Sequence, residues 1–157
     1  MAIYIKFDGI DGEVVENKHE KWTEIKSFSV SGHKPGNGKC GAERVSGSTE
    51  FHDVCVSKNS DLTSPKLLES MAKGKSFDKV EVHYVTTTDE GPNAITKYEL
   101  KNVYITGWDQ ATHGDRPGEN MTLNYEEFKV EQFPVKPDGK LGAPVEFAWS
   151  ISKAKTA

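Results

Sequence analysis

The chain has 157 residues, 28% of them charged, and a formal net charge of −4. This length predicts one domain whose core is large enough to need no disulfide or metal. The sequence has no basic stripe, no signal peptide and no apolar run of membrane-spanning length, so we expect a protein synthesised in the cytoplasm that binds neither nucleic acid nor membrane.

The N-terminal segment "AIYIKF" alternates apolar and polar residues and predicts a strand. Three carboxylates follow within a few residues, Asp8, Asp11 and Glu13. Their spacing departs from the D-x-[DN]-x-[DN]-G pattern of a calcium loop. A pair of catalytic carboxylates would have to face each other across a cleft, which neighbours on one turn rarely do. Because Asp11-Gly12 is a strong turn dipeptide, we interpret this segment as a strand that ends in a turn.

A further strand pattern, "IKSFSVSG", places Phe28 and Val30 on one face. The other face carries the small hydroxyl residues Ser27, Ser29 and Ser31. Burial of Phe28 in the core would turn these serines outward. From the residues alone, this outer face is either an ordinary solvent surface or the wall of a functional space.

The loop from Ser31 to Gly47 contains five glycines and one proline and shows no strand pattern. Most connections have about 4–6 residues, and longer ones are usually functional or mobile. A phosphate-binding loop would have to lead into a helix, whereas strand-like sequence follows here. We therefore expect a flexible loop.

One stretch, "TSPKLLESMAKGK", predicts a helix over about residues 64–74. Ser64 suits the N-cap and Pro65 the first helical position. Gly74 is placed to end the helix in a left-handed conformation.

The rest of the chain alternates with the period of strands. In "MTLNYEEFKVEQF" the apolar phase changes at Glu126-Glu127, and "YELKNVYI" has a similar ambiguity around Lys101-Asn102. Bends or bulges there would keep both halves of each segment on the core. The last strand, "PVEFAWSIS", has one apolar face that we expect to lie in the core, formed by Val145, Phe147, Trp149 and Ile151.

The predicted fold class is mainly β, with a single domain over residues 1–157. We expect a closed β-barrel or two packed antiparallel sheets with one short helix.

The residues offer no constellation for catalysis or metal binding. There is no HExxH, G-x-S-x-G or P-loop sequence. His52 and Cys55 point to opposite faces of a predicted strand, and His83 is expected on a solvent face. Cys40 and Cys55 form no CxxC pair, and ordinary thiols are favoured over one disulfide. These observations favour a binding or structural protein over an enzyme, without a cofactor.

The order of segments along the chain resembles the haemolysin-coregulated protein (Hcp) family of type VI secretion systems. The likeness runs nearly end to end. It is carried by "YIKFDGIDGE", "IKSFSVSG", "DLTSPKLLESMAKGKSF", "YELKNVYITGW" and "GENMTLNYEEFKVEQFPVKPDGKLGAPVEFAWSI".

The resemblance implies a tube subunit without catalytic activity or cofactor. Its members form homo-hexameric rings that stack into a tube, which is tipped by a VgrG spike and driven out of the cell by a contractile sheath. Small effector proteins are carried in the lumen. By this resemblance Ser27, Ser29 and Ser31 are candidates for the lumen wall. The candidates for ring stacking lie in the long loop: His33, Lys34, Lys39 and Arg44.

An alternative of another class is a monomeric β-barrel binding module, for example one for carbohydrate. A row of exposed aromatic residues on one sheet would favour it. Trp22, Trp108 and Trp149 lie on three separate segments and predict no such row.

Overall fold

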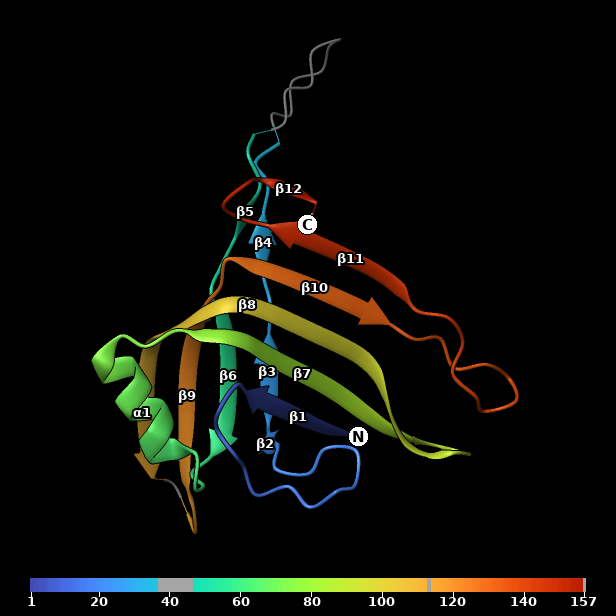
Figure 1. Ribbon diagram of the computed structural model, residues 1–157, viewed down its shortest axis with the longest axis horizontal. Helices are drawn as coiled ribbons and strands as arrows, with labels where there is room; N and C mark the ends of the chain where they lie inside the picture. Colours follow the sequence, from blue (N-terminus) through green and yellow to red (C-terminus); the bar gives the residue numbers. More distant parts are fainter. Residues whose placement is uncertain (37–46, 113, 157) are drawn as a thin grey trace.

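The computed structural model describes residues 1–36, 47–112 and 114–156. This part of the chain forms one helix and twelve strands (Figure 1). The elements in chain order are β1 (Ala2–Phe7), β2 (Thr23–Ile25), β3 (Ser27–Ser29), β4 (Gly32–His33), β5 (Glu50–Phe51), β6 (Val54–Asn59), α1 (Ser64–Lys73), β7 (Phe77–Thr88), β8 (Gly91–Thr112), β9 (Pro117–Asn124), β10 (Glu127–Gln132), β11 (Val145–Ser150) and β12 (Lys155–Thr156).

The strands pair antiparallel in two main sheets. Sheet A has the order β12-β11-β10-β8-β7-β1-β2, and sheet B has the order β3-β6-β9-β8. The long strand β8 belongs to both sheets, and β2 passes to β3 through the single residue Lys26. The prediction of two antiparallel sheets with one helix is confirmed. The sheets do not form a closed barrel. Within the described residues sheet A ends at β2, which pairs with β1 alone, and sheet B ends at β3, which pairs with β6 alone.

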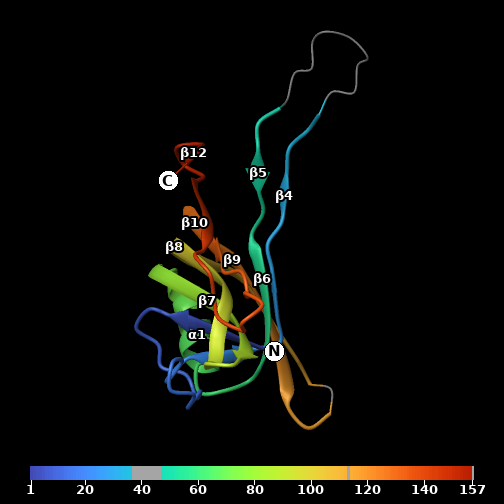
Figure 2. The ribbon, with the colours of Figure 1, turned by 90° about the vertical axis from the view of Figure 1, so that its right-hand side faces the viewer.

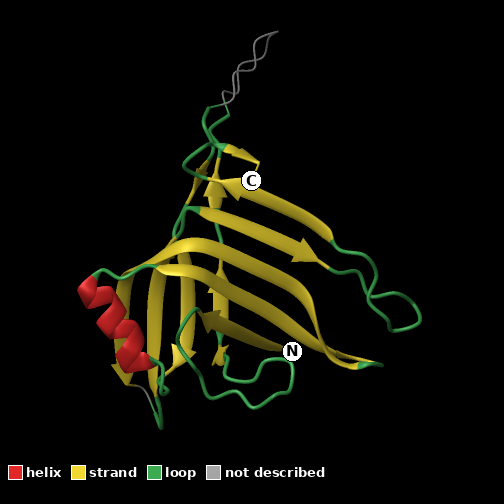
Figure 3. Cartoon of the chain, viewed as in Figure 1, coloured by secondary structure: helices red, strands yellow, loops and turns green. Residues whose placement is uncertain are grey.

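The core lies between the two sheets and the helix, which flanks one end of the sheets beside β8 and β9 (Figure 3). The strand alternation predicted from the sequence directs the apolar side chains of β1, β6, β7 and β9 inward. Fully or almost fully buried members include Ile5, Phe7, Val54, Val80, Val82, Leu100, Val103 and Leu123.

Both predicted changes of phase mark the places where the chain leaves one sheet for the other. In β8, Asn102 has a positive φ of 50°. The strand pairs with β10 up to Lys101 and with β7 up to Val103, and it pairs with β9 from Tyr104 onward. The second change falls between β9 in sheet B and β10 in sheet A, at Tyr125-Glu126. Each bend keeps buried side chains on both sides of the crossing: Val103 after the first, Tyr125 and Phe128 around the second.

The helix is found as predicted, but its N-cap is Thr63 and not Ser64. Ser64 lies in the first turn, and its hydroxyl is engaged with the side chains of Lys58 and Glu119 and the backbone N–H of Asp61. The serine is therefore used for a tertiary network in place of a local cap. Gly74 ends the helix with a φ of 65°, as expected for a left-handed C-cap.

The long loop was expected to have no strand, and this was wrong for its described flanks. Gly32 pairs with Phe51 and His33 with Glu50, so β4 and β5 form a two-stranded ribbon. Figure 2 shows β4 and β5 side by side, running away from β6 and the helix toward the height of β12. We call residues 31–52 the arm. Its candidate residues Lys39 and Arg44, like Cys40, lie outside the described residues.

The last strand also departs from expectation. Val145, Phe147 and Ile151 were predicted to lie in the core, but their side chains are 76%, 44% and 36% exposed. The alternation is real, but β11 lies near the edge of sheet A and no described element covers this part of it. Trp149 is half-buried and packs against the core. No helix in the described part of the chain is long and apolar enough to span a membrane.

Candidate assembly and cargo surfaces

The first strand ends in a turn as predicted, but the turn lies at Asp8-Gly9 and not at Asp11-Gly12. β1 ends at Phe7, and Gly9 follows with a φ of 80°. Asp11 pairs with Lys6, with 2.9 Å between Oδ1 and Nζ. This hydrogen-bonded ion pair lowers the pKa of Asp11. Among the described residues, no group of three or more His, Cys, Asp or Glu side chains is arranged to hold a metal.

The outer face of sheet B is built almost entirely from small side chains. Cross-strand pairing aligns Ser27 with Ser57, Ser57 with Asn120, and Asn120 with Asp109. A second row aligns four further residues in the same order of strands: Ser29, Cys55, Thr122 and Gly107.

Ser27, Ser29 and Ser31 are all exposed. Burial of Phe28 against Tyr84 and Tyr98 explains why the serines point outward. Sequence reasoning found the serines, but it missed their neighbours on β6, β8 and β9, because strand pairing that joins distant segments has no local signal.

The outer face of sheet A has the opposite character, with long side chains of alternating charge. Lys129 pairs with Glu131 and with Glu146, both at 2.9 Å. These two carboxylates raise the pKa of Lys129. Lys101 lies within 3.9 Å of Glu99 and Glu127. Such exposed pairs contribute little to stability each, but they make this face strongly hydrophilic.

A histidine of β7 and one of the segment before β2 form a contact that the sequence did not indicate. His83 was expected on a solvent face, but it is half-buried and its Nδ1 lies 2.9 Å from Nε2 of His19. Nδ1 of His19 in turn contacts Glu16 at 2.5 Å, and Trp22 packs against both imidazole rings. Burial, with nearby positive charge on His19 and Lys97, lowers the pKa of His83 from 6.5 to about 4. The cluster ties the segment before β2 onto β7.

A buried polar network joins β6, β9 and the start of α1. Lys58 Nζ lies 2.8 Å from Asp61 and 3.0 Å from Glu119, and the side chains of Lys58 and Glu119 are fully buried. Ser64 donates to Glu119 at 2.9 Å. Burial alone would raise the pKa of Asp61, but the bonds from Lys58 and Thr63 bring it below its usual value. All these groups are paired, so the network has no open coordination position and serves the fold.

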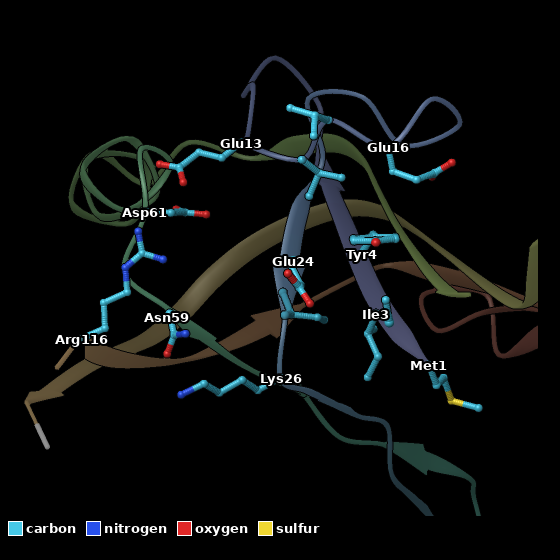
Figure 4. Close-up of a pocket in the computed structure, with 14 residues that line it drawn as sticks. Met1, Ile3, Tyr4, Glu13, Glu16, Glu24, Lys26, Asn59, Asp61 and Arg116 are labelled. Atoms are coloured by element: carbon cyan, nitrogen blue, oxygen red, sulfur yellow. The ribbon is translucent and has the colours of Figure 1, made fainter. Parts of the chain in front are cut away.

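A groove of about 730 Å³ runs beside β1 and β2 (Figure 4). Glu13, Glu24 and Asp61 line it together with Lys26 and Arg116, so its charges have both signs. Glu13 is also engaged by the backbone N–H of Leu62. The groove brings together no nucleophile with a base to activate it, and we assign no chemistry to it.

Among the described residues, an apolar surface is open at β11 and just after it. We call it the apolar face of β11, and it is formed by Val145, Phe147 and Trp149 of the strand and by Ile151 in the turn that follows. Phe147 stacks on Trp149 and packs against Phe128 in β10. Phe51, at the base of the arm, packs on the same cluster through Phe128 and Trp149. An exposed apolar surface on an edge region is typical of a contact with another protein chain.

Comparison with known proteins decides the family. The family model described as "Type VI secretion system effector, Hcp" matches residues 4–132. The chain belongs to the Hcp family. A similar Hcp protein is hcp1 of Pseudomonas aeruginosa, which is 26% identical over 152 residues, covering 95% of this chain and 94% of that protein.

Solved structures of Hcp proteins have the same fold. A type six secretion system protein of known structure superposes with a TM-score of 0.92 at 26% identity, covering 99% of both chains. The crystal structure of Hcp1 from Salmonella typhimurium gives a TM-score of 0.80 at 20% identity, over 99% of this chain and 98% of that one. The second likeness concerns the fold alone. The resemblance seen in the sequence is confirmed.

The three tryptophans form no exposed row of the kind that a carbohydrate-binding module would need. Trp22, Trp108 and Trp149 are all half-buried and lie on separate elements. Trp22 packs on the histidine pair, and the other two pack against the core.

Proposed function

We propose that this chain is the tube subunit of a type VI secretion system. In this proposal six copies form a ring, rings stack into a tube, and effector proteins travel in the lumen. Family membership supports the link to type VI secretion. The observation that carries self-assembly is the apolar face of β11, which no described part of the chain covers. A second copy of the chain would bury it, and the burial would favour a ring over separate subunits.

The outer face of sheet B supplies the lumen wall in this proposal, with Ser27, Ser29 and Ser31 among its residues. Small hydroxyl side chains suit a wall that must hold varied cargo and then release it. Each hydrogen bond that is exchanged with water nets only about 1 kcal/mol. The charged outer face of sheet A suits contact with water.

The arm supplies the contact between rings. His33 and Lys34, in its described part, are exposed, and Lys39 and Arg44 belong to the same segment of the sequence. Its strands β4 and β5 run together away from the helix and the lower ends of the sheets, a direction that suits a contact with a neighbouring ring (Figure 2). A head-to-tail contact of this kind is open-ended and builds filaments.

The remaining partners in the proposal are a VgrG-like spike, a contractile sheath and small effector proteins. The subunit would be synthesised in the cytoplasm and exported through the secretion system itself. We assign it no catalytic activity, because the polar clusters described above are engaged in ion pairs and hydrogen bonds that hold the fold.

The test is the mass of the assembly in solution, measured by light scattering, together with negative-stain images. We expect rings of six subunits for the parent chain. Phe147→Ser, which removes an exposed aromatic from the apolar face of β11, should shift the mass toward the monomer. Leu68→Ser, which removes a partly exposed leucine of α1, is the matched control and should leave the ring intact. A parent chain that stays monomeric at high concentration would refute the proposal.

A further inference from the structure

A hollow of about 230 Å³ opens on the outer face of sheet B. It is bordered by residues of β3, β6, β8 and β9, so it spans the whole width of this sheet. The residues that decide its chemistry are Ser57, Gly107, Asp109 and Asn120.

The hollow exists because of a glycine and a bulge in β8. The register of β8 against β9 shifts between Ile105 and Gly107, which leaves Thr106 as the extra residue. Gly107 then faces Thr122, and a Cβ built on Gly107 would lie only 2.6 Å from the Thr122 hydroxyl oxygen. A side chain at this position would force Thr122 to move, and with glycine the space above the sheet stays open.

The polarity of the hollow is set by its rim. Val56, Trp108 and Met121 border it, but their side chains belong to the core on the other face of the sheet. The rim carries hydroxyl and amide groups and one carboxylate, Asp109. This combination suits the polar, hydrogen-donating end of a long side chain.

The carboxylate of Asp109 has free acceptor capacity. Asn120 donates one hydrogen bond to Oδ2 at 3.2 Å, and within the described structure Oδ1 receives none. Asp53, the other acid near this face, has both oxygens engaged, by Thr106 at 2.7 Å and by Asn124 at 3.0 Å. In the two aligned rows of the face, Asp109 is the one charged residue, and neither row holds Lys or Arg.

We propose that this hollow binds a Lys or Arg side chain of a cargo protein, with Asp109 as its counter-ion. The aliphatic stem lies over the surface that Gly107 leaves open, and the cationic end donates to the free oxygen of Asp109 and to the hydroxyls of the rim. Charge-assisted bonds of this kind are about twice as strong as neutral ones. That the occupant is cargo rests on the proposed function, in which this face lines the lumen. Six such hollows around one ring would favour cargo with a basic surface.

The first experiment tests the hollow itself, on the full chain. N-acetyl-arginine amide is titrated in, and the NMR signals of the Asn120 side-chain amide and the Gly107 backbone N–H are followed. N-acetyl-citrulline amide, a neutral analogue of nearly the same shape, is the control ligand. We expect the arginine derivative to shift both signals, and Asp109→Asn to weaken its binding about tenfold or more. Asp78→Asn, an exposed acid of β7 on another surface, should leave the binding unchanged.

Equal binding of the citrulline derivative, or equal weakening by Asp78→Asn, would overturn the proposal. So would arginine binding that survives Asp109→Asn, because the counter-ion would then lie elsewhere. The NMR titration does not depend on ring formation. If the chain binds arginine but never forms rings, the proposed tube function and the cargo as occupant are refuted. The hollow as a binding site for a basic side chain would still stand.

The second experiment tests the occupant in assembled rings. One small folded reporter domain is made with added surface lysines and, separately, with the same number of added glutamates. Rings of the parent chain should retain the basic reporter at least tenfold longer than the acidic one, and Asp109→Asn should reduce this difference. Rings that hold both reporters equally long would overturn the basic-cargo inference and leave the tube function standing.

Discussion

Lys58 and Glu119 form an ion pair of 3.0 Å in which neither side chain reaches solvent. The pair joins neighbouring residues of β6 and β9 and is completed by Asp61 and Ser64 at the start of α1. It is therefore the polar link between sheet B and the helix. Both charges depend on each other, because a buried charge without a partner is far more costly than the pair.

Removing one member of this pair should destabilise the protein strongly. For Glu119→Gln or Lys58→Met alone we expect a loss of about 3–5 kcal/mol in the free energy of unfolding, measured by urea denaturation. The double variant Lys58→Met/Glu119→Leu should lose clearly less than the sum of its single variants, since it leaves no unpaired charge between them. Additive losses would show that the two charges act independently.

The histidine pair makes stability depend on pH. The pKa of His83 is about 4 in the folded chain and 6.5 when unperturbed, so the unfolded chain binds a proton more readily at this residue. The neutral His83 side chain makes its full contribution to the stability of the fold above about pH 6.5. This contribution is lost as the pH falls from 6.5 toward 4. His83 is surrounded by His19, Lys97, Lys79 and Tyr4, and His19 is paired with Glu16.

We therefore expect thermal melting curves of the parent chain to shift to lower temperature over this range of pH. In His83→Gln the shift should be smaller. The control is His33→Gln, which changes an exposed histidine of the arm. This variant should retain the full pH dependence of the melting temperature. An unchanged slope in His83→Gln would assign the effect to another group.

Asn102 holds a left-handed conformation at the point where β8 crosses between the sheets. Asn102→Val should cost about 1–3 kcal/mol, because a β-branched residue is strained at a positive φ. Asn102→Gly relieves the strain and should stay close to the parent, although it loses the 2.9 Å hydrogen bond to Glu126. Urea denaturation of the two variants separates backbone strain from the loss of this bond. Similar losses in both would make the hydrogen bond the main contribution.

Ser29 tests the proposed lumen wall. Ser29→Gln should still give stable hexamers but reduce the retention of effector proteins, because a longer side chain narrows the channel without touching the core. Size-exclusion chromatography with light scattering reports the ring, and co-purification reports the cargo. Ser76→Gln, at an exposed position after α1, is the control. Lost hexamers would place Ser29 in a subunit interface, and unchanged retention would place it outside the lumen.

The arm can be shortened without opening the body of the chain. Joining His33 to Glu50 through Asn-Gly keeps the pair that the structure shows and supplies a favoured hairpin turn. We expect an unchanged ring mass and weaker stacking of rings, followed by sedimentation and electron microscopy. A second variant replaces the segment between His33 and Glu50 with a Gly/Ser segment of the same length. It distinguishes an effect of the length of the arm from an effect of its side-chain contacts. Stacking as strong as in the parent would mean that the arm has another role.

The sequence predicted those features that depend on neighbours along the chain. Alternation identified the strands, Pro65 and Gly74 located the helix, and the breaks in phase at Asn102 and Glu126 located the crossings between sheets. Each of these is set by local backbone chemistry or by the direction in which one strand must turn its apolar side chains.

Features that depend on distant segments could not be predicted in this way. His83 alternates like a solvent-facing residue, and only the fold brings His19 over it. Lys58 and Glu119 look like surface positions, yet register places them opposite each other in the interior. Phe147 has the pattern of a core residue, but whether an apolar face is covered depends on elements outside its own strand, and here on another chain in the proposed ring.

The shared strand β8 has a mechanical consequence. It runs as 22 consecutive residues through both sheets, so a force applied to one sheet reaches the other along covalent bonds and not only through side-chain packing. Within each sheet the load then spreads sideways through ladders of hydrogen bonds, many of which must break together before neighbouring strands slide. A subunit built in this way resists axial thrust as one stiff body, and a stack of such rings under a push from behind would yield first at the contacts between rings.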